Sequence, residues 1–152
     1  LPTGGAFAGR PLAPGRAVVV SEEPAGIWAA RRDALGIPPD GVRLITRGLL
    51  PKMTPDEWAE FVAHLTAQLA ADPADLVVLD TLANLWPVRD ENNAAEVTAA
   101  LAPLHPLAAG RSLLLVHHLR KNDGDQGTGS RGSGALFGFV DVLAELRRVK
   151  GD

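Results

Sequence analysis

Short apolar runs alternate with amphipathic segments along most of the chain. Four runs of β-branched and aliphatic residues, each bounded by turn residues, predict strands at 17–21, 42–46, 76–80 and 112–116. The run "LVVLD" (76–80) is apolar without alternation, which is typical of a strand buried on both faces of a parallel sheet. A fifth strand is predicted at 140–146, and the Gly- and Pro-rich residues 1–16 are predicted to be irregular.

Helical periodicity appears between the predicted strands. Residues 24–36 predict a helix that Pro24 opens and Gly36 closes. The sequence "TPDE" (54–57) is a capping box, and it begins the clearest helix of the chain. The apolar face of this helix carries Trp58, Phe61, Val62, Leu65 and Leu69.

A third helix is predicted after residue 93, where Asn93 together with Glu96 can cap its start. Pro103 and Pro106 should kink or shorten this helix. Alternating strands and helices predict an α/β fold with a mostly parallel sheet and helices on both faces. A length of 152 residues suits a single domain over 1–152.

Composition narrows the classes of partner. The formal net charge of −3 argues against a broadly basic nucleic-acid surface. The chain has no cysteine and no apolar run long enough to cross a bilayer, so we expect a cytoplasmic protein without a membrane partner.

Polar residues follow the predicted strands where ligands bind in open parallel sheets, which is beyond the carboxyl ends of the strands. These residues are Glu22, Glu23, Asp80, Thr81, His117 and His118. Because three separate strand ends contribute to the set, its convergence is a stronger indication of a site than any one residue.

Each acidic candidate has two interpretations. Asp80 could hold a hard cation such as Mg²⁺, or be a solvated loop aspartate. Glu22 or Glu23 could orient a water for attack on a phosphoryl group, or both could be favourable charges at a helix N-terminus. We do not expect both glutamates to face the site.

The basic candidate residues also have more than one interpretation. His117 and His118 are neighbours on a strand, so they cannot easily bind one metal ion; one of them could donate to a phosphate oxygen or be structural. Arg131 lies in a polar, Gly-rich loop (120–134), where it is either solvated or a finger that reaches a phosphate. Arg120 and Lys121 compete for the same role.

Four segments, in order, resemble the RecA-like P-loop ATPases, closest to the branch of RepA-type hexameric replicative helicases and their AAA-type ATPase relatives. They are "VVVSEEP", "LVVLDTLANLWPVRDENNAAEV", "LLLVHHLRK" and "RGSGALFGFVDVLAELRR". The resemblance covers nearly all of residues 1–152. It implies ATP and Mg²⁺ as cofactors and "LVVLD" as the Walker B strand.

The same resemblance implies residue roles. Asp80, followed by Thr81, would act on Mg²⁺ through water, and Glu22 would activate the attacking water. His118, with His117 beside it, would sense the γ-phosphate. Arg131 would act as a finger across a subunit interface of a homo-oligomer, with a hexamer as one candidate, and DNA would be a partner on the resemblance alone.

One departure from this family is large, because no lysine stands in a G-x-x-x-x-G-K-[ST] phosphate loop. The three lysines are Lys52, Lys121 and Lys150. We expect that the loop and its strand precede Leu1 and that the domain is incomplete at both ends; the alternative is a natural chain that lost nucleotide binding. Two strands should then face a gap in the sheet. We therefore expect the fragment to pair with another segment or to shift its strands. We also expect that it does not hydrolyse ATP alone.

The resemblance therefore implies a DNA-associated ATPase domain of the helicase or recombination type. Two other functions remain open: a non-catalytic interaction module with the same fold, and a metal-dependent hydrolase that uses Asp80 and a histidine.

Overall fold

The computed structural model describes residues 5–7, 9–38, 40–46, 51–118 and 134–146. A parallel sheet of four strands forms its centre, in the order β4-β3-β5-β6. The strands are β3 (Ala17–Ser21), β4 (Val42–Thr46), β5 (Leu76–Asp80) and β6 (Ser112–Leu115). The helices are α1 (Ala25–Leu35), α2 (Pro55–Ala71), α3 (Leu82–Leu85), α4 (Ala94–Leu101), α5 (Leu104–Ala108) and α6 (Ala135–Phe139).

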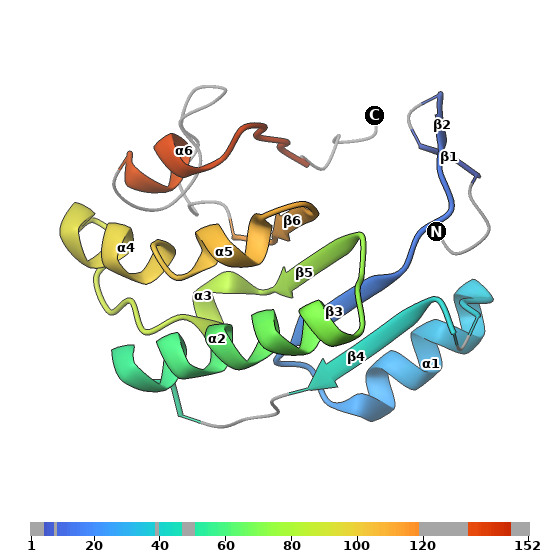
Figure 1. Cartoon of the computed structure of the whole chain (residues 1–152), viewed down its shortest axis with the longest axis horizontal. Coiled ribbons are helices and arrows are strands. Elements are labelled where there is room, and N and C mark those ends of the chain that lie inside the picture. Colours follow the sequence, from blue (N-terminus) through green and yellow to red (C-terminus); the bar gives the residue numbers. More distant parts are fainter. Residues whose placement is uncertain (1–4, 8, 39, 47–50, 119–133, 147–152) are drawn as a thin grey trace, which may run out of the picture.

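One face of the sheet is covered by α2, α4 and α5, which lie together on one side of the strands (Figure 1). Val18, Val20, Val77 and Leu79 point to this face, and all four are buried. Trp58 of α2 is 1% exposed, and its indole Nε1 donates to the carbonyl of Ala100 over 2.8 Å. We call this layer the covered face; it is the hydrophobic core of the domain.

The opposite face is covered by α1, which packs beside β4 and leaves β6 open. Strand register places Leu44, Val19, Val78 and Leu114 in one row across this face. Val19 is buried, whereas Leu114 is 50% exposed. Helices on both faces of a parallel sheet were predicted from the sequence, and the prediction is confirmed.

The helix ends follow local sequence rules. Thr54 and Glu57 form the predicted capping box at the start of α2. Asn93 caps α4 by accepting from the backbone N–H groups of Ala95 and Glu96, as predicted. Prolines 103 and 106 shorten the predicted third helix, which is divided into α4 and α5.

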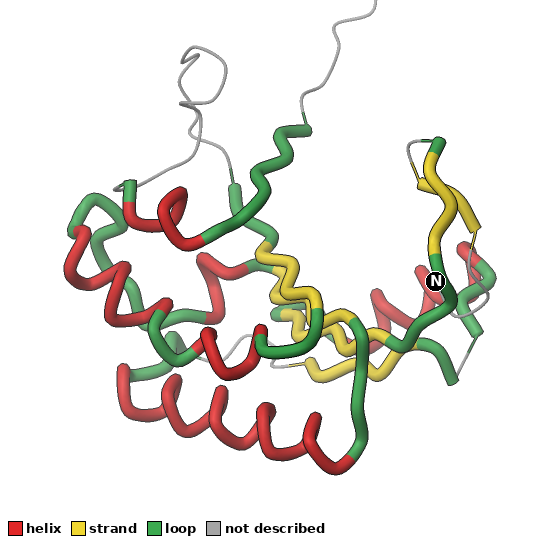
Figure 2. The backbone as a smooth tube through the Cα atoms, turned by 45° about the horizontal axis from the view of Figure 1, so that its top comes forward, coloured by secondary structure: helices red, strands yellow, loops and turns green. Residues whose placement is uncertain are grey.

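Two expectations about secondary structure are wrong. Part of the supposedly irregular start forms an antiparallel hairpin of β1 (Gly5–Phe7) and β2 (Arg10–Leu12), and Figure 2 shows it standing away from the main sheet. Residues 140–146 are not a strand. Val142 is 82% and Leu146 93% exposed, and without a neighbouring strand β-forming residues have nothing to pair with.

The expected gap is not found within the sheet of the described residues. β3 pairs with β4 and β5, and β5 pairs with β6, each in parallel and in continuous register. Any further strand would therefore be added at an outer edge of β4 or β6.

Candidate functional site

The carboxyl ends of β3, β5 and β6 meet at one edge of the sheet, which we call the rim. Register pairs Ser21 with Asp80, so Glu22 emerges directly beside Asp80. The N–H of Val116 donates to the carbonyl of Leu79 over 3.0 Å, which brings the chain after β6 to the same edge. The rim thus gathers Glu22, Asp80 and His118, which the sequence predicts to converge.

Glu22 is fixed by residues that follow β5. Its carboxylate accepts hydrogen bonds from the backbone N–H and the hydroxyl of Thr81, the latter over 3.2 Å. The side-chain amide of Asn84 donates to the same carboxylate over 3.0 Å. The N–H of Glu22 in turn donates to the carbonyl of Asp80 over 3.2 Å. Glu22 is therefore held against the end of β5 by both its side chain and its backbone.

These hydrogen bonds set the charge of Glu22. Partial burial acts to raise its pKa, but the hydrogen bonds from Asn84, the backbone and Thr81 outweigh burial and lower the pKa of Glu22 below its ordinary value. Glu22 is consequently a carboxylate at neutral pH. A fixed, ionised carboxylate at a rim suits the polarisation of a water molecule.

Asp80 experiences the opposite environment. Burial raises its pKa, and the nearby carboxylates of Glu22 and Glu23 raise it further. Electrostatic interactions with Arg31 and His118 act in the other direction without cancelling the shift. Negative charge is therefore concentrated around Asp80, and a bound cation would relieve it.

Glu23 is close enough to Asp80 to raise the pKa of that carboxyl group, but its own carboxylate is paired with an arginine. It binds the guanidinium of Arg31 through two hydrogen bonds, one of 2.8 Å. Arg31 also lies over the ring of Trp28, with its Cζ 5.2 Å from the ring centroid. This ion pair explains why Glu22, and not Glu23, is free to contact Thr81.

The two histidines point in different directions. His117 packs against the edge of Trp86, with ring centroids 5.9 Å apart. His118 is exposed and lies close enough to Asp80 for its charge to affect that carboxyl group. Of the two, His118 is the one placed at the rim. Arg131, Arg120 and Lys121 lie outside the described residues.

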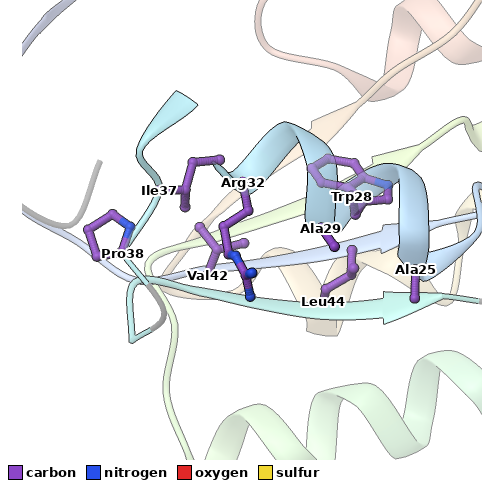
Figure 3. A pocket seen from close by; sticks show the side chains of 8 residues that line it. All are labelled: Ala25, Trp28, Ala29, Arg32, Ile37, Pro38, Val42 and Leu44. Atoms are coloured by element: carbon purple, nitrogen blue, oxygen red, sulfur yellow. The ribbon is translucent and has the colours of Figure 1, made fainter. Parts of the chain in front are cut away.

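One cavity of about 220 Å³ lies between α1 and β4 (Figure 3). Its lining is largely apolar and includes Trp28, Ile37, Val42 and Leu44, with Arg32 as its charged member. None of the predicted site residues that the structure describes lines it. The candidate site is the polar rim and not this cavity.

The rim suits a magnesium ion, which needs few protein ligands, better than it suits a metal ion that several side chains must bind. Asp80 offers a single partly buried carboxylate, and Mg²⁺ takes one or two carboxylates and keeps several waters. Within the described part of the chain, no three His, Asp or Glu side chains are grouped so that they could hold a metal ion.

Asn84 is the site residue that the sequence did not indicate. It reaches Glu22 because the short helix α3 begins directly after β5 and turns this side chain back over the rim. A polar residue four positions after the strand-end aspartate is the signal that could have pointed to it.

The sequence model of a family described as an AAA domain matches residues 1–124 of the chain. The chain belongs to this AAA domain family. It is therefore an ATPase-type domain of the P-loop nucleotide-binding class. The match includes the whole rim, with Glu22, Asp80 and His118.

A comparison with curated proteins finds no match. In the described residues, none of the helices combines the length and the apolar character needed to span a membrane.

Proposed function

We propose that this AAA domain hydrolyses ATP with Mg²⁺ and that the rim is its catalytic edge. The observation that carries the proposal is the fixed carboxylate of Glu22, which Thr81 and Asn84 hold beside Asp80. Glu22 is ionised while Asp80 lies where negative charge is concentrated. Two acids with pKa values shifted in opposite directions are typical of a site that divides its roles between them.

In this proposal Glu22 orients and polarises the attacking water, accepting its proton as a general base. Asp80, with Thr81 next to it, would hold the magnesium ion. Magnesium, when bound, would neutralise charge that develops on the phosphoryl oxygens. His118 donates to the terminal phosphate from the third strand end.

The chain lacks the G-x-x-x-x-G-K-[ST] sequence that cradles phosphates, so the proposal assigns turnover to the full-length protein that contains this domain. We further propose the RepA-type branch of RecA-like ATPases, a homo-oligomer in which Arg131 reaches a neighbour's site, and action on DNA. The order of the four sequence segments supports these assignments, whereas the net charge of −3 offers no support for DNA binding.

The proposal is tested by ATP turnover of the full-length protein with the single variants Glu22→Gln and Asp80→Ala. We expect each to lower kcat by at least about 100-fold, since Glu22→Gln removes the base that polarises the attacking water and Asp80→Ala removes the carboxylate proposed to hold the metal. Glu60→Gln, which removes an exposed acid from α2, is the charge-matched control and should turn over ATP like the wild type.

Three results would contradict the proposal. Unchanged turnover in both rim variants would show that the chemistry takes place elsewhere. A wild-type protein that binds ATP without hydrolysing it would favour the interaction module. Zinc retained through purification and required for activity would favour the metal-dependent hydrolase.

A further inference from the structure

A second polar cluster lies beside the rim, between the chain after β6 and the loop that joins α3 to α4. Nε2 of His117 lies 3.3 Å from a carboxylate oxygen of Glu91. The side chains of His117 and Glu91 are only 9% and 21% exposed. The ring of His117 also meets Trp86 edge-on. None of these three residues has a role in the proposed reaction.

The other ring nitrogen of His117 contacts the backbone of His118. Nδ1 of His117 lies 3.0 Å from the carbonyl oxygen of His118. A carbonyl oxygen and a carboxylate can only accept, so the Nδ1 and Nε2 contacts are both hydrogen bonds when both ring nitrogens carry protons. His117 therefore connects Glu91, through its ring, to the backbone of the histidine that lies next to Asp80.

The loop that carries Glu91 is anchored at the three residues directly before it, 88–90. The ammonium group of Lys52 donates to the carbonyl of Val88 over 2.8 Å. The carboxylate of Glu96 accepts from the backbone N–H groups of Arg89 and Asp90, so it holds the loop instead of completing a capping box with Asn93. Glu91 is thus presented to His117 by a loop with fixed anchors, as a positioning role requires.

We propose that Glu91 is a positioning residue that sets the orientation of His118 through His117. The contact with Glu91 and the edge of Trp86 fix the His117 ring. The Nδ1 hydrogen bond then fixes the peptide that carries the His118 side chain to the rim. The kinetic consequence rests on the proposed ATPase function, whereas the structural connection does not.

The experiment combines two readouts on the full-length protein. The imidazole signals of His118 are followed by NMR in histidine-labelled protein and assigned with a His118→Gln variant. Glu91→Gln keeps the size of the side chain and removes its charge. We expect it to move the signals of both His117 and His118, while His64 and His105, on α2 and α5, stay unchanged as internal references.

ATP turnover provides the second readout. We expect Glu91→Gln to lower kcat by on the order of 10-fold. This is the smaller end of the loss found when a group that orients a functional histidine is removed. KM for ATP should stay unchanged, and a general loss of folding would instead lower the midpoint of thermal unfolding. Glu60→Gln should alter neither readout.

The outcomes separate this inference from the proposed function. If the His117 signals move and those of His118 do not, Glu91 does not position His118 and the inference is wrong. If both move in a protein without ATP turnover, the positioning role holds and the proposed ATPase function fails. Unchanged kcat with displaced His118 signals would overturn the catalytic consequence of the positioning.

Discussion

The covered face and the rim are built on the same strands, yet they use their residues differently. On the covered face, Val20 and Leu79 each end a row of buried apolar side chains. One residue later, the same two strands end in Ser21 and Asp80, and polar contacts replace packing. The face gains stability from burial, whereas the rim brings two carboxylates close together and raises the pKa of one of them.

This difference indicates where substitutions should act. A change on the covered face removes buried area and should lower the free energy of unfolding strongly. A change at the rim alters charge and hydrogen bonding in a half-buried site, so it should affect activity far more than stability.

The largest effect is expected for Trp58→Ala on the covered face. Removing this buried side chain leaves a cavity beside α4, and we expect a loss of about 3–5 kcal/mol in the free energy of unfolding. Trp58→Phe keeps most of the volume but leaves the Ala100 carbonyl without its donor, at a cost of about 1–3 kcal/mol. Denaturant titration measures the loss of unfolding free energy in both variants. Because both lack the indole donor, equal losses would show that the removed volume costs nothing beyond the hydrogen bond, which would contradict the expected cavity.

An intermediate effect is expected for Asn84→Ala at the rim. The variant removes a hydrogen bond that favours the ionised carboxylate, so the pKa of Glu22 should rise. The acidic limb of the pH–kcat profile of the full-length protein should move to higher pH by the same amount. A limb that stays in place would mean that Glu22 is not the titrating base.

The smallest effect is expected in the pH dependence of stability at the rim. The lowered pKa of Glu22 contributes stability that is present above its unfolded pKa of about 4.3 and is lost as the pH falls through the folded value. The raised pKa of Asp80 has the opposite sign: its cost is absent at low pH and develops as the pH rises from about 3.9 through the folded value.

Two variants isolate these contributions. Near neutral pH, Glu22→Gln should lower the free energy of unfolding and Asp80→Asn should raise it, each by less than about 1 kcal/mol because solvent screens both groups. Both differences should shrink at acid pH. Thermal unfolding from pH 3 to pH 7 measures them, and differences of the same sign would contradict the assigned environments.

Sequence reasoning worked best where the determinants are local. The strands of the main sheet and the capping box of α2 depend on residues that are neighbours in the chain, and they were predicted at nearly the observed bounds. Residues 140–146 have the composition of a strand, but a strand also needs a partner, which no local pattern reveals.

The rim was predictable as a location and not as a set of contacts. Strand ends converge by topology, so Glu22, Asp80 and His118 could be grouped from sequence alone. The different environments of Glu22 and Glu23 depend on Arg31 and Asn84, which approach from helices after the strands. Those side chains meet only in three dimensions.

The central claim, that Asp80 at the rim acts on the metal of a bound nucleotide, is tested most directly by Mn²⁺ binding. Electron paramagnetic resonance of the full-length protein with a non-hydrolysable ATP analogue gives the affinity for this magnesium substitute. We predict that Asp80→Asn weakens Mn²⁺ binding by at least about 10-fold, while Glu60→Gln binds like the wild type. Equal Mn²⁺ affinity in the wild type and Asp80→Asn would contradict the account.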